Sequence, residues 1–141
     1  MILMNKVFVD TSFLIALLNS QDADHTVALV LQAELASQPV DKLTSEYILL
    51  ELGDGLSKLR YRNLAVQTVE LLKQDSTFHI IPASNEIWKN AWSLFTSYQD
   101  KEWSLTDCTS FVLMRQFNLN SALTADKHFQ QAGFRALLLE I

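Results

Sequence analysis

Short strand-like segments alternate with longer helical segments along this chain, and this alternation limits its fold more than any other feature. Three strands are expected at residues 6–9, 42–45 and 78–81. A fourth is expected within 121–129, ending at Asp126, and a fifth at 135–141. Strands separated by helices of ten or more residues pair in parallel through right-handed crossovers. We therefore expect an α/β fold, a three-layer α/β/α sandwich with a central parallel sheet.

The helical segments are identified by apolar residues three or four positions apart and by residues that favour helix ends. Asp10, Thr11 and Ser12 offer capping side chains for the first helix, and Pro39 ends the second. One long helix is expected over 45–62 despite its two glycines. The expected helices are residues 13–19, 22–37, 45–62, 64–73, 84–99 and 104–118.

The composition is typical of one compact domain, which we expect to span residues 1–141. Hydrophobic residues make up 49% of the chain, and three Gly and two Pro leave little material for linkers. The single Cys108 excludes an internal disulfide, and no segment resembles a signal peptide or a membrane span, so we expect a cytoplasmic protein. The net charge of −5 argues against a nucleic-acid coat protein, although bound divalent cations would still allow a nuclease.

Two aspartates follow strands that are far apart in the sequence. Asp10 comes directly after the apolar segment 6–9, and Asp126 ends the strand near the C-terminus. Because parallel strands present their carboxyl ends at one edge of a sheet, the two carboxylates are expected to meet there. The alternative is that each one only caps a helix.

Two further acids lie on helices beside apolar residues. Glu51 borders the apolar face of the helix expected at 45–62, and Asp107 begins a helix whose inward face includes Phe111. The alternative for Glu51 is an ion pair with Lys58 or Arg60. The alternative for Asp107 is a first-turn acid that the helix dipole favours.

A metal ion would explain four carboxylates directed toward a core that has no matching set of buried bases. Their mutual repulsion and desolvation are costly, and a hard cation such as Mg²⁺ or Mn²⁺ offsets both. Zinc fits less well, because Cys108 and the three histidines show no ligand spacing. His25, His79 and His128 are accordingly expected to be ordinary surface or core residues.

Four motifs in this order resemble PIN domains, especially the VapC-like toxins of toxin–antitoxin pairs. They are "VFVDTSFLIALLN", "TSEYILLELGDGLSK", "SLTDCTSFVLM" and "LTADKHFQQAGF". The resemblance implies a Mg²⁺- or Mn²⁺-dependent ribonuclease that hydrolyses phosphodiester bonds. It further implies a homodimer and a small antitoxin whose C-terminal segment occupies the acidic groove.

The resemblance assigns roles to individual residues. The catalytic and metal-binding quartet falls on Asp10, Glu51, Asp107 and Asp126. Asp10 and Asp107 are expected to be direct ligands, Asp126 a ligand or a residue that orients one, and Glu51 a ligand or the base for water. Hydroxyl groups that would hold these carboxylates are those of Thr11, Ser12 and Thr124, with helix capping as the alternative for the first two.

Two other features suggest binding surfaces. Lys58, Arg60 and Arg62 surround Tyr61 at an expected helix end, which is a candidate track for RNA phosphates; the alternative is a solvated end whose cations complement the dipole. A stripe of aromatic residues, Trp88, Trp92 and Phe95, is expected either in the core or at a dimer or partner surface.

Three functions remain open at this point. The first is a toxin endoribonuclease, the second a PIN-like nuclease of ordinary RNA processing or decay, and the third a catalytically silent binding module. Intact acids at all four positions favour the two enzymes.

Overall fold

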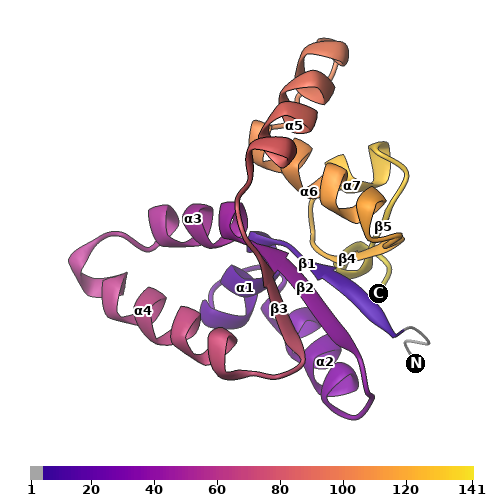
Figure 1. Cartoon of the computed structure of the whole chain (residues 1–141). Coiled ribbons are helices and arrows are strands. Elements are labelled where there is room, and N and C mark those ends of the chain that lie inside the picture. Colours follow the sequence, from indigo (N-terminus) through magenta and orange to yellow (C-terminus); the bar gives the residue numbers. More distant parts are fainter. Residues whose placement is uncertain (1–4) are drawn as a thin grey trace.

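Five parallel strands form the centre of the molecule in a computed structural model that describes residues 5–141 (Figure 1). They are β1 (Lys6–Val9), β2 (Asp41–Ser45), β3 (Phe78–Ile81), β4 (Ser121–Leu123) and β5 (Arg135–Ala136). Their order across the sheet is β3-β2-β1-β4-β5, and every neighbouring pair is parallel. The expected α/β fold with a central parallel sheet is confirmed.

Helices cover both faces of this sheet. They are α1 (Thr11–Leu18), α2 (His25–Ala36), α3 (Glu46–Gly55), α4 (Leu59–Gln74), α5 (Asn85–Ser97), α6 (Leu105–Gln116) and α7 (Lys127–Gln131), followed by the 3-10 turn η1 (Leu137–Leu139). Helices α1, α2 and α4 lie on one side of the sheet, and α6 and α7 lie on the other (Figure 1). Among residues 5–141, no helix has the length and apolarity to cross a bilayer.

Aromatic side chains join the sheet to the helices on the side of α6 and α7. The Phe129 ring on α7 lies 6.5 Å from that of Phe8 on β1 and 5.0 Å from that of Phe111 on α6, the latter edge-on. All three side chains are almost completely buried. Burying a side chain of this size contributes about 1.5–3 kcal/mol, so this cluster fixes α6 and α7 against the sheet.

The expected helix over residues 45–62 is wrong, because the chain forms two helices there. Helix α3 ends at Gly55 and α4 begins at Leu59. Gly53 and Gly55 weaken the end of α3, while the buried Leu56 anchors the turn between the helices. The helix expected at 64–73 is therefore the second part of α4.

The expected strands near the C-terminus are too long. Strand β4 stops at Leu123 because side-chain hydroxyls then accept the backbone hydrogen bonds, from Ala125 N–H to Ser12 Oγ and from Asp126 N–H to Thr124 Oγ1. Strand β5 has only two residues, and the apolar residues after it form η1. Burial, and not strand pairing, explains that apolar run.

The strand order places a binding crevice beside the end of β1. The chain runs from β1 outward to β2 and β3, and then returns to β4 on the other side of β1. Val9 and Leu123 are register partners, so the next residues, Asp10 and Thr124, leave the sheet side by side. In open parallel sheets, such a reversal of strand order is where ligands bind.

Candidate metal centre

Asp10 is held at the end of β1 by two hydroxyl groups. Its Oδ2 accepts hydrogen bonds from Thr124 Oγ1 at 2.8 Å and from Ser12 Oγ at 3.0 Å. Although Asp10 is the N-cap residue of α1, its side chain makes no capping hydrogen bond. Capping therefore does not explain this buried carboxylate.

Asp10 is also the most strongly perturbed acid of the site. Burial raises the pKa of its carboxyl from 3.8 to about 6, although the hydrogen bonds from Thr124 and Ser12 oppose this rise. The negative charges of Asp107 and Glu51 raise the pKa further. The ionised form of Asp10 therefore lacks a nearby positive charge that would stabilise it.

Thr11 does not have the role that was expected for it. Its hydroxyl oxygen is buried and has no hydrogen-bond partner within residues 5–141. Ser12 and Thr124 hold the carboxylate instead. The difference follows from the start of α1, where Ser12 and not Thr11 lies beside the end of β4, with its Oγ 3.1 Å from Thr124 Oγ1.

Asp107 comes from the first turn of α6. Ser104 Oγ accepts the N–H of Asp107 at 2.9 Å, and Asp107 Oδ2 accepts the N–H of Ser104 at 3.1 Å, which completes a capping box. The pKa of Asp107 is raised, mainly by burial and then by the charge of Asp126. The capping role and the position in the acidic site are thus both real.

Asp126 begins α7 and lies next to a histidine. Its Oδ1 accepts the N–H of His128 at 2.8 Å, and Nδ1 of the same histidine lies 3.3 Å away. Nδ1 of His128 also lies 3.1 Å from Asp107 Oδ2. His128 is therefore not the ordinary surface or core residue that was expected, because ligand atoms of Asp107, Asp126 and His128 gather within 4.8 Å of one another.

Glu51 reaches the same pocket from α3. The residue is partly buried and follows the buried Ile48 by three positions. No ion pair joins it to Lys58 or Arg60 in the part of the chain that the structure describes. The alternative interpretation of Glu51 as an ion-paired surface residue is therefore not supported.

A pocket of about 540 Å³ brings all four expected acids together. Three more acids, which the sequence analysis missed, line it as well: Asp22 and Asp24 in the loop before α2, and Glu102 in the loop before α6. No Lys or Arg lines the pocket within residues 5–141. The spacing Asp-x-Asp at 22–24 was a local signal for the first two, whereas no local pattern in the sequence marks Glu102.

The free oxygen atoms of the aspartates form a donor set that fits a hard cation. In Asp10, Asp107 and Asp126, one carboxylate oxygen accepts the hydrogen bonds described above. The other oxygen of each accepts none from residues 5–141. Mg²⁺ and Mn²⁺ prefer such carboxylate oxygens, so the site is suited to binding a divalent metal ion.

The three cations expected to bind RNA lie at the start of a helix. Lys58 is the N-cap residue of α4, and Arg60 and Arg62 are in its first turns, where no acid is present. The helix dipole is positive at this end, so these cations do not complement it. The alternative interpretation, that they serve the dipole, is wrong.

Comparisons with known proteins agree with this fold and site. The PIN domain family matches residues 7–135. Two relatives, from the CDC 1551 and H37Rv strains of Mycobacterium tuberculosis, are described as the 23S rRNA-specific endonuclease VapC20. Each is 31% identical over 128 residues, which cover 91% of this chain and 95% of the relative.

Solved structures of two similar proteins have the same fold. The crystal structure of Mycobacterium tuberculosis VapC20, described as a sarcin–ricin loop cleaving toxin, has a TM-score of 0.79 and 30% identity, and the match covers 91% of this chain and 95% of that one. FitAcB from Neisseria gonorrhoeae has a TM-score of 0.65 and 20% identity, with 96% and 99% covered, and shows the fold alone.

The chain belongs to the PIN domain family. It is a homologue of VapC-type toxins and a VapC-like endoribonuclease, as the four motifs implied. The acidic cluster indicates a metal ion as its cofactor.

Proposed function

We propose that this VapC-like endoribonuclease is the toxin of a toxin–antitoxin pair and that it hydrolyses RNA with the help of Mg²⁺ or Mn²⁺. One observation carries this proposal: four carboxylates from separate elements share one pocket that no described Lys or Arg lines. A structural acid cluster would be expected to contain basic partners, because unpaired buried carboxylates destabilise a fold. In an enzyme that binds a cation, the bound ion offsets this destabilisation.

Asp10 and Asp107 are the proposed direct ligands of the ion. Both are buried, and each has one oxygen fixed by hydrogen bonds and one oxygen without a protein donor in the described chain. Asp126 is proposed to complete the set, and Glu51 to bind the ion or to accept a proton from water. A bound Mg²⁺ or Mn²⁺ supplies the Lewis acidity that activates water and stabilises the leaving oxygen.

Ser12 and Thr124 are the proposed positioning residues of Asp10. Their hydroxyls both donate to Oδ2, which fixes the carboxylate in one rotation. The same two hydroxyls accept backbone N–H groups from Ala125 and Asp126, so the loop after β4 is held in the same network. Thr11 is not part of this network.

RNA phosphates are proposed to bind Lys58, Arg60 and Arg62. The Arg60 guanidinium lies 4.7 Å from the centre of the Tyr61 ring. Together these two planar groups form a suitable surface for stacking a base. Because cations at a helix N-terminus do not help the helix, a role in binding anions accounts for their position.

This basic turn adjoins the acidic pocket. A groove between α1 and α4 is lined by Tyr61 and Leu64, and it shares Ile15 and Gly55 with the acidic pocket. An RNA strand that lies along the groove can therefore extend its backbone toward the carboxylates. The C-terminal segment of an antitoxin is proposed to occupy the same acidic groove and to exclude RNA from it.

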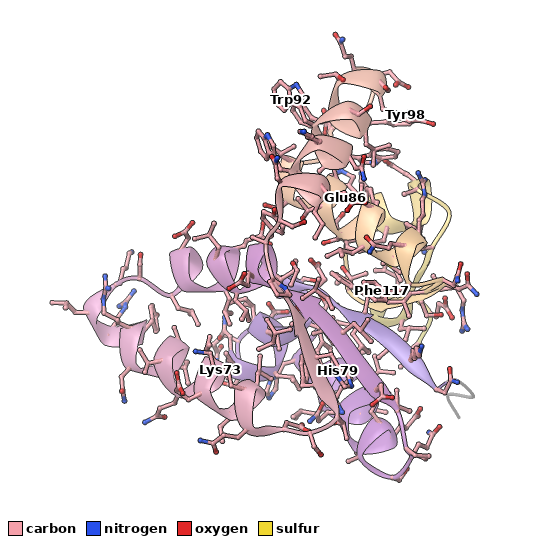
Figure 2. All side chains as sticks on the ribbon, in the orientation of Figure 1. Lys73, His79, Glu86, Trp92, Tyr98 and Phe117 are labelled. Carbon is pink, nitrogen blue, oxygen red and sulfur yellow. The ribbon has the colours of Figure 1, made fainter. Side chains whose placement is uncertain are left out.

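A second copy of the chain is proposed to cover α5. Trp88, Trp92 and Phe95 stack along this helix with ring centres 5.8 and 5.7 Å apart, and their exposed fractions are 46%, 48% and 39%. Figure 2 shows Trp92 on the outer side of α5, away from the sheet. Exposed stacked aromatic rings of this kind are enriched at protein interfaces, which supports a homodimer.

Cleavage of RNA tests the proposed function. VapC20 is described as specific for 23S rRNA, so intact ribosomes are the proposed substrate, in keeping with activity in the cytoplasm. Purified protein with MnCl₂ or MgCl₂ should cut ribosomal RNA at a discrete position, mapped by primer extension. EDTA and the Asp10→Asn variant should abolish the product. Full activity in EDTA would contradict the metal-dependent chemistry.

Expression in a host without an antitoxin separates a toxin from a nuclease of ordinary RNA decay. Induction of the wild-type chain should stop growth, and Asp10→Asn should restore it. Growth that continues while the protein is folded and active on RNA in the lysate would contradict the toxin assignment.

A further inference from the structure

His128 joins two carboxylates that belong to different helices. Its Nδ1 lies 3.1 Å from Asp107 Oδ2, in the first turn of α6, and 3.3 Å from Asp126 Oδ1, at the N-cap of α7. The histidine side chain is only 20% exposed. No other described residue contacts both of these carboxylates through its side chain.

The hydrogen-bond partners determine which ring nitrogen carries a hydrogen. Ionised carboxylate oxygens only accept hydrogen bonds, so an Nδ1 atom that bonds Asp107 must donate. A nitrogen that carries a hydrogen has no free lone pair for a metal ion. Nδ1 of His128 is therefore a donor to the acids and not a ligand beside them.

The oxygens that His128 contacts are those that already accept other protein hydrogen bonds. Asp107 Oδ2 also accepts the N–H of Ser104, and Asp126 Oδ1 also accepts the backbone N–H of His128. Asp107 Oδ1 and Asp126 Oδ2 are left without a protein donor among residues 5–141. His128 thus holds one oxygen of each acid, that of Asp107 through its imidazole and that of Asp126 through its backbone N–H, and leaves the other oxygen of each for a ligand.

We propose that His128 is a positioning residue: its Nδ1–H bonds Asp107, its backbone N–H bonds Asp126, and together they hold the free oxygens of both acids in the arrangement that binds a divalent cation. The proposal rests on the metal site of the proposed function. The two carboxylates repel each other, and the imidazole N–H, which bonds Asp107 and lies 3.3 Å from Asp126, reduces that repulsion before the ion binds. The resulting site loses less conformational freedom when the ion arrives.

Binding of Mn²⁺ to the metal-free protein tests the proposal, with free Mn²⁺ measured by its electron paramagnetic resonance signal. His128→Gln should weaken binding about 10- to 100-fold. His128→Asn should bind within a few-fold of wild type, because the Asn amide is placed where Nδ1–H was. The Gln amide is one carbon too far, so the two variants differ in the position of one donor. Circular dichroism checks that both are folded.

His79→Ala is the matched control. His79 Nε2 lies 3.1 Å from Asp41 Oδ1, the same length as the His128–Asp107 pair, but on the surface of β2 and β3. Figure 2 shows His79 on β3, away from α6 and α7. Its loss should leave Mn²⁺ binding unchanged.

Three results would overturn the proposal. The first is unchanged Mn²⁺ affinity in folded His128→Gln, and the second is ¹⁴N coupling from a directly bound imidazole in the spin-echo spectrum of the wild-type Mn²⁺ complex. The third is no Mn²⁺ binding by the wild type. RNA cleavage measured on the same samples separates this inference from the proposed function. If wild type binds Mn²⁺ and the variants behave as expected without cleavage, only the ribonuclease proposal fails.

Discussion

Thr124 donates its hydroxyl hydrogen to Asp10 across 2.8 Å, although the two residues are 114 positions apart in the sequence. The contact follows from the parallel register of β1 and β4, which places Val9 beside Leu123 and so brings the next two residues together. Two strands from opposite ends of the chain therefore build one half of the acidic site.

Replacing Thr124 with Val should weaken metal binding. A hydrogen bond to a charged group contributes about 1.5–3 kcal/mol, so loss of the donor should reduce Mn²⁺ affinity at pH 7 about tenfold or more. The pKa of Asp10 should rise further, because the Thr124 hydroxyl lowers it. Isothermal titration calorimetry measures the affinity. Thr68→Val is the control, since Thr68 Oγ1 bonds only the Leu64 carbonyl on α4; equal losses in both variants would contradict the assigned role.

The stability of the metal-free protein should fall as the pH rises. The carboxyl of Asp10 has a pKa of about 6 in the fold and 3.8 ordinarily, so the folded state holds this proton more tightly than the unfolded state. Its stabilising contribution is complete below pH 3.8 and is lost as the pH rises through 6. One pKa unit corresponds to about 1.4 kcal/mol, and the unfolded chain is already partly ionised at pH 4, so about 2 kcal/mol should be lost between pH 4 and pH 7.

Urea unfolding in EDTA at several pH values measures this loss. Asp10→Asn cannot ionise, so it should be more stable than wild type at pH 7 and should lose the stabilisation by Mn²⁺. Above pH 6, addition of Mn²⁺ should restore the free energy of unfolding that the metal-free wild-type protein has lost. If the difference in free energy of unfolding between wild type and Asp10→Asn did not change with pH, the burial of an ionised Asp10 would be contradicted.

Neutralising the basic turn of α4 should affect RNA and not the metal ion. The double variant Arg60→Gln, Arg62→Gln should raise KM for RNA several-fold, reduce its salt dependence and leave Mn²⁺ affinity unchanged. Lys73→Gln, at the other end of the same helix, is the control. The double variant should also be no less stable than wild type, because the lost cations oppose the helix dipole. An unchanged KM and salt dependence would contradict the phosphate track.

The aromatic face of α5 should control assembly. Light scattering should find a dimer for the wild-type chain and a monomer for Trp88→Ala, Trp92→Ala. Leu71→Ala serves as control, because Leu71 is 67% exposed on α4, outside this face. A monomeric wild type at micromolar concentration, or a dimer that survives loss of both rings, would contradict the proposed interface.

Much of the fold was predictable because its signals are local. The apolar segment before Asp10 and the helical spacing on either side of the strands indicated a parallel sheet. The break between α3 and α4 was missed, because the two glycines weaken a helix without fixing where it ends, and the buried Leu56 decides that point through tertiary packing. The strand expected at 135–141 was too long for a related reason, since a buried apolar run does not by itself specify strand pairing.

The acids of the site were predictable where they followed strands or bordered apolar faces. Asp10 and Glu51 had such positions, and both line the pocket. His128 and Glu102 were missed, because each enters the site only through the packing of α7 and the α5–α6 loop against α6. The carboxylate that a His contacts depends on this packing, and sequence spacing alone does not give it.

Asp107 and Asp126 each accept backbone hydrogen bonds at the start of a helix, whereas Glu51 accepts none from the described chain. An accidental change at either aspartate would therefore disturb a helix start along with the chemistry, and the damaged chain would be exposed to proteolysis. With the role proposed for Glu51, a change there would leave a folded protein without activity. If it still bound the proposed antitoxin, the inactive protein would compete with active toxin for that antitoxin and so leave more toxin uninhibited in the cell.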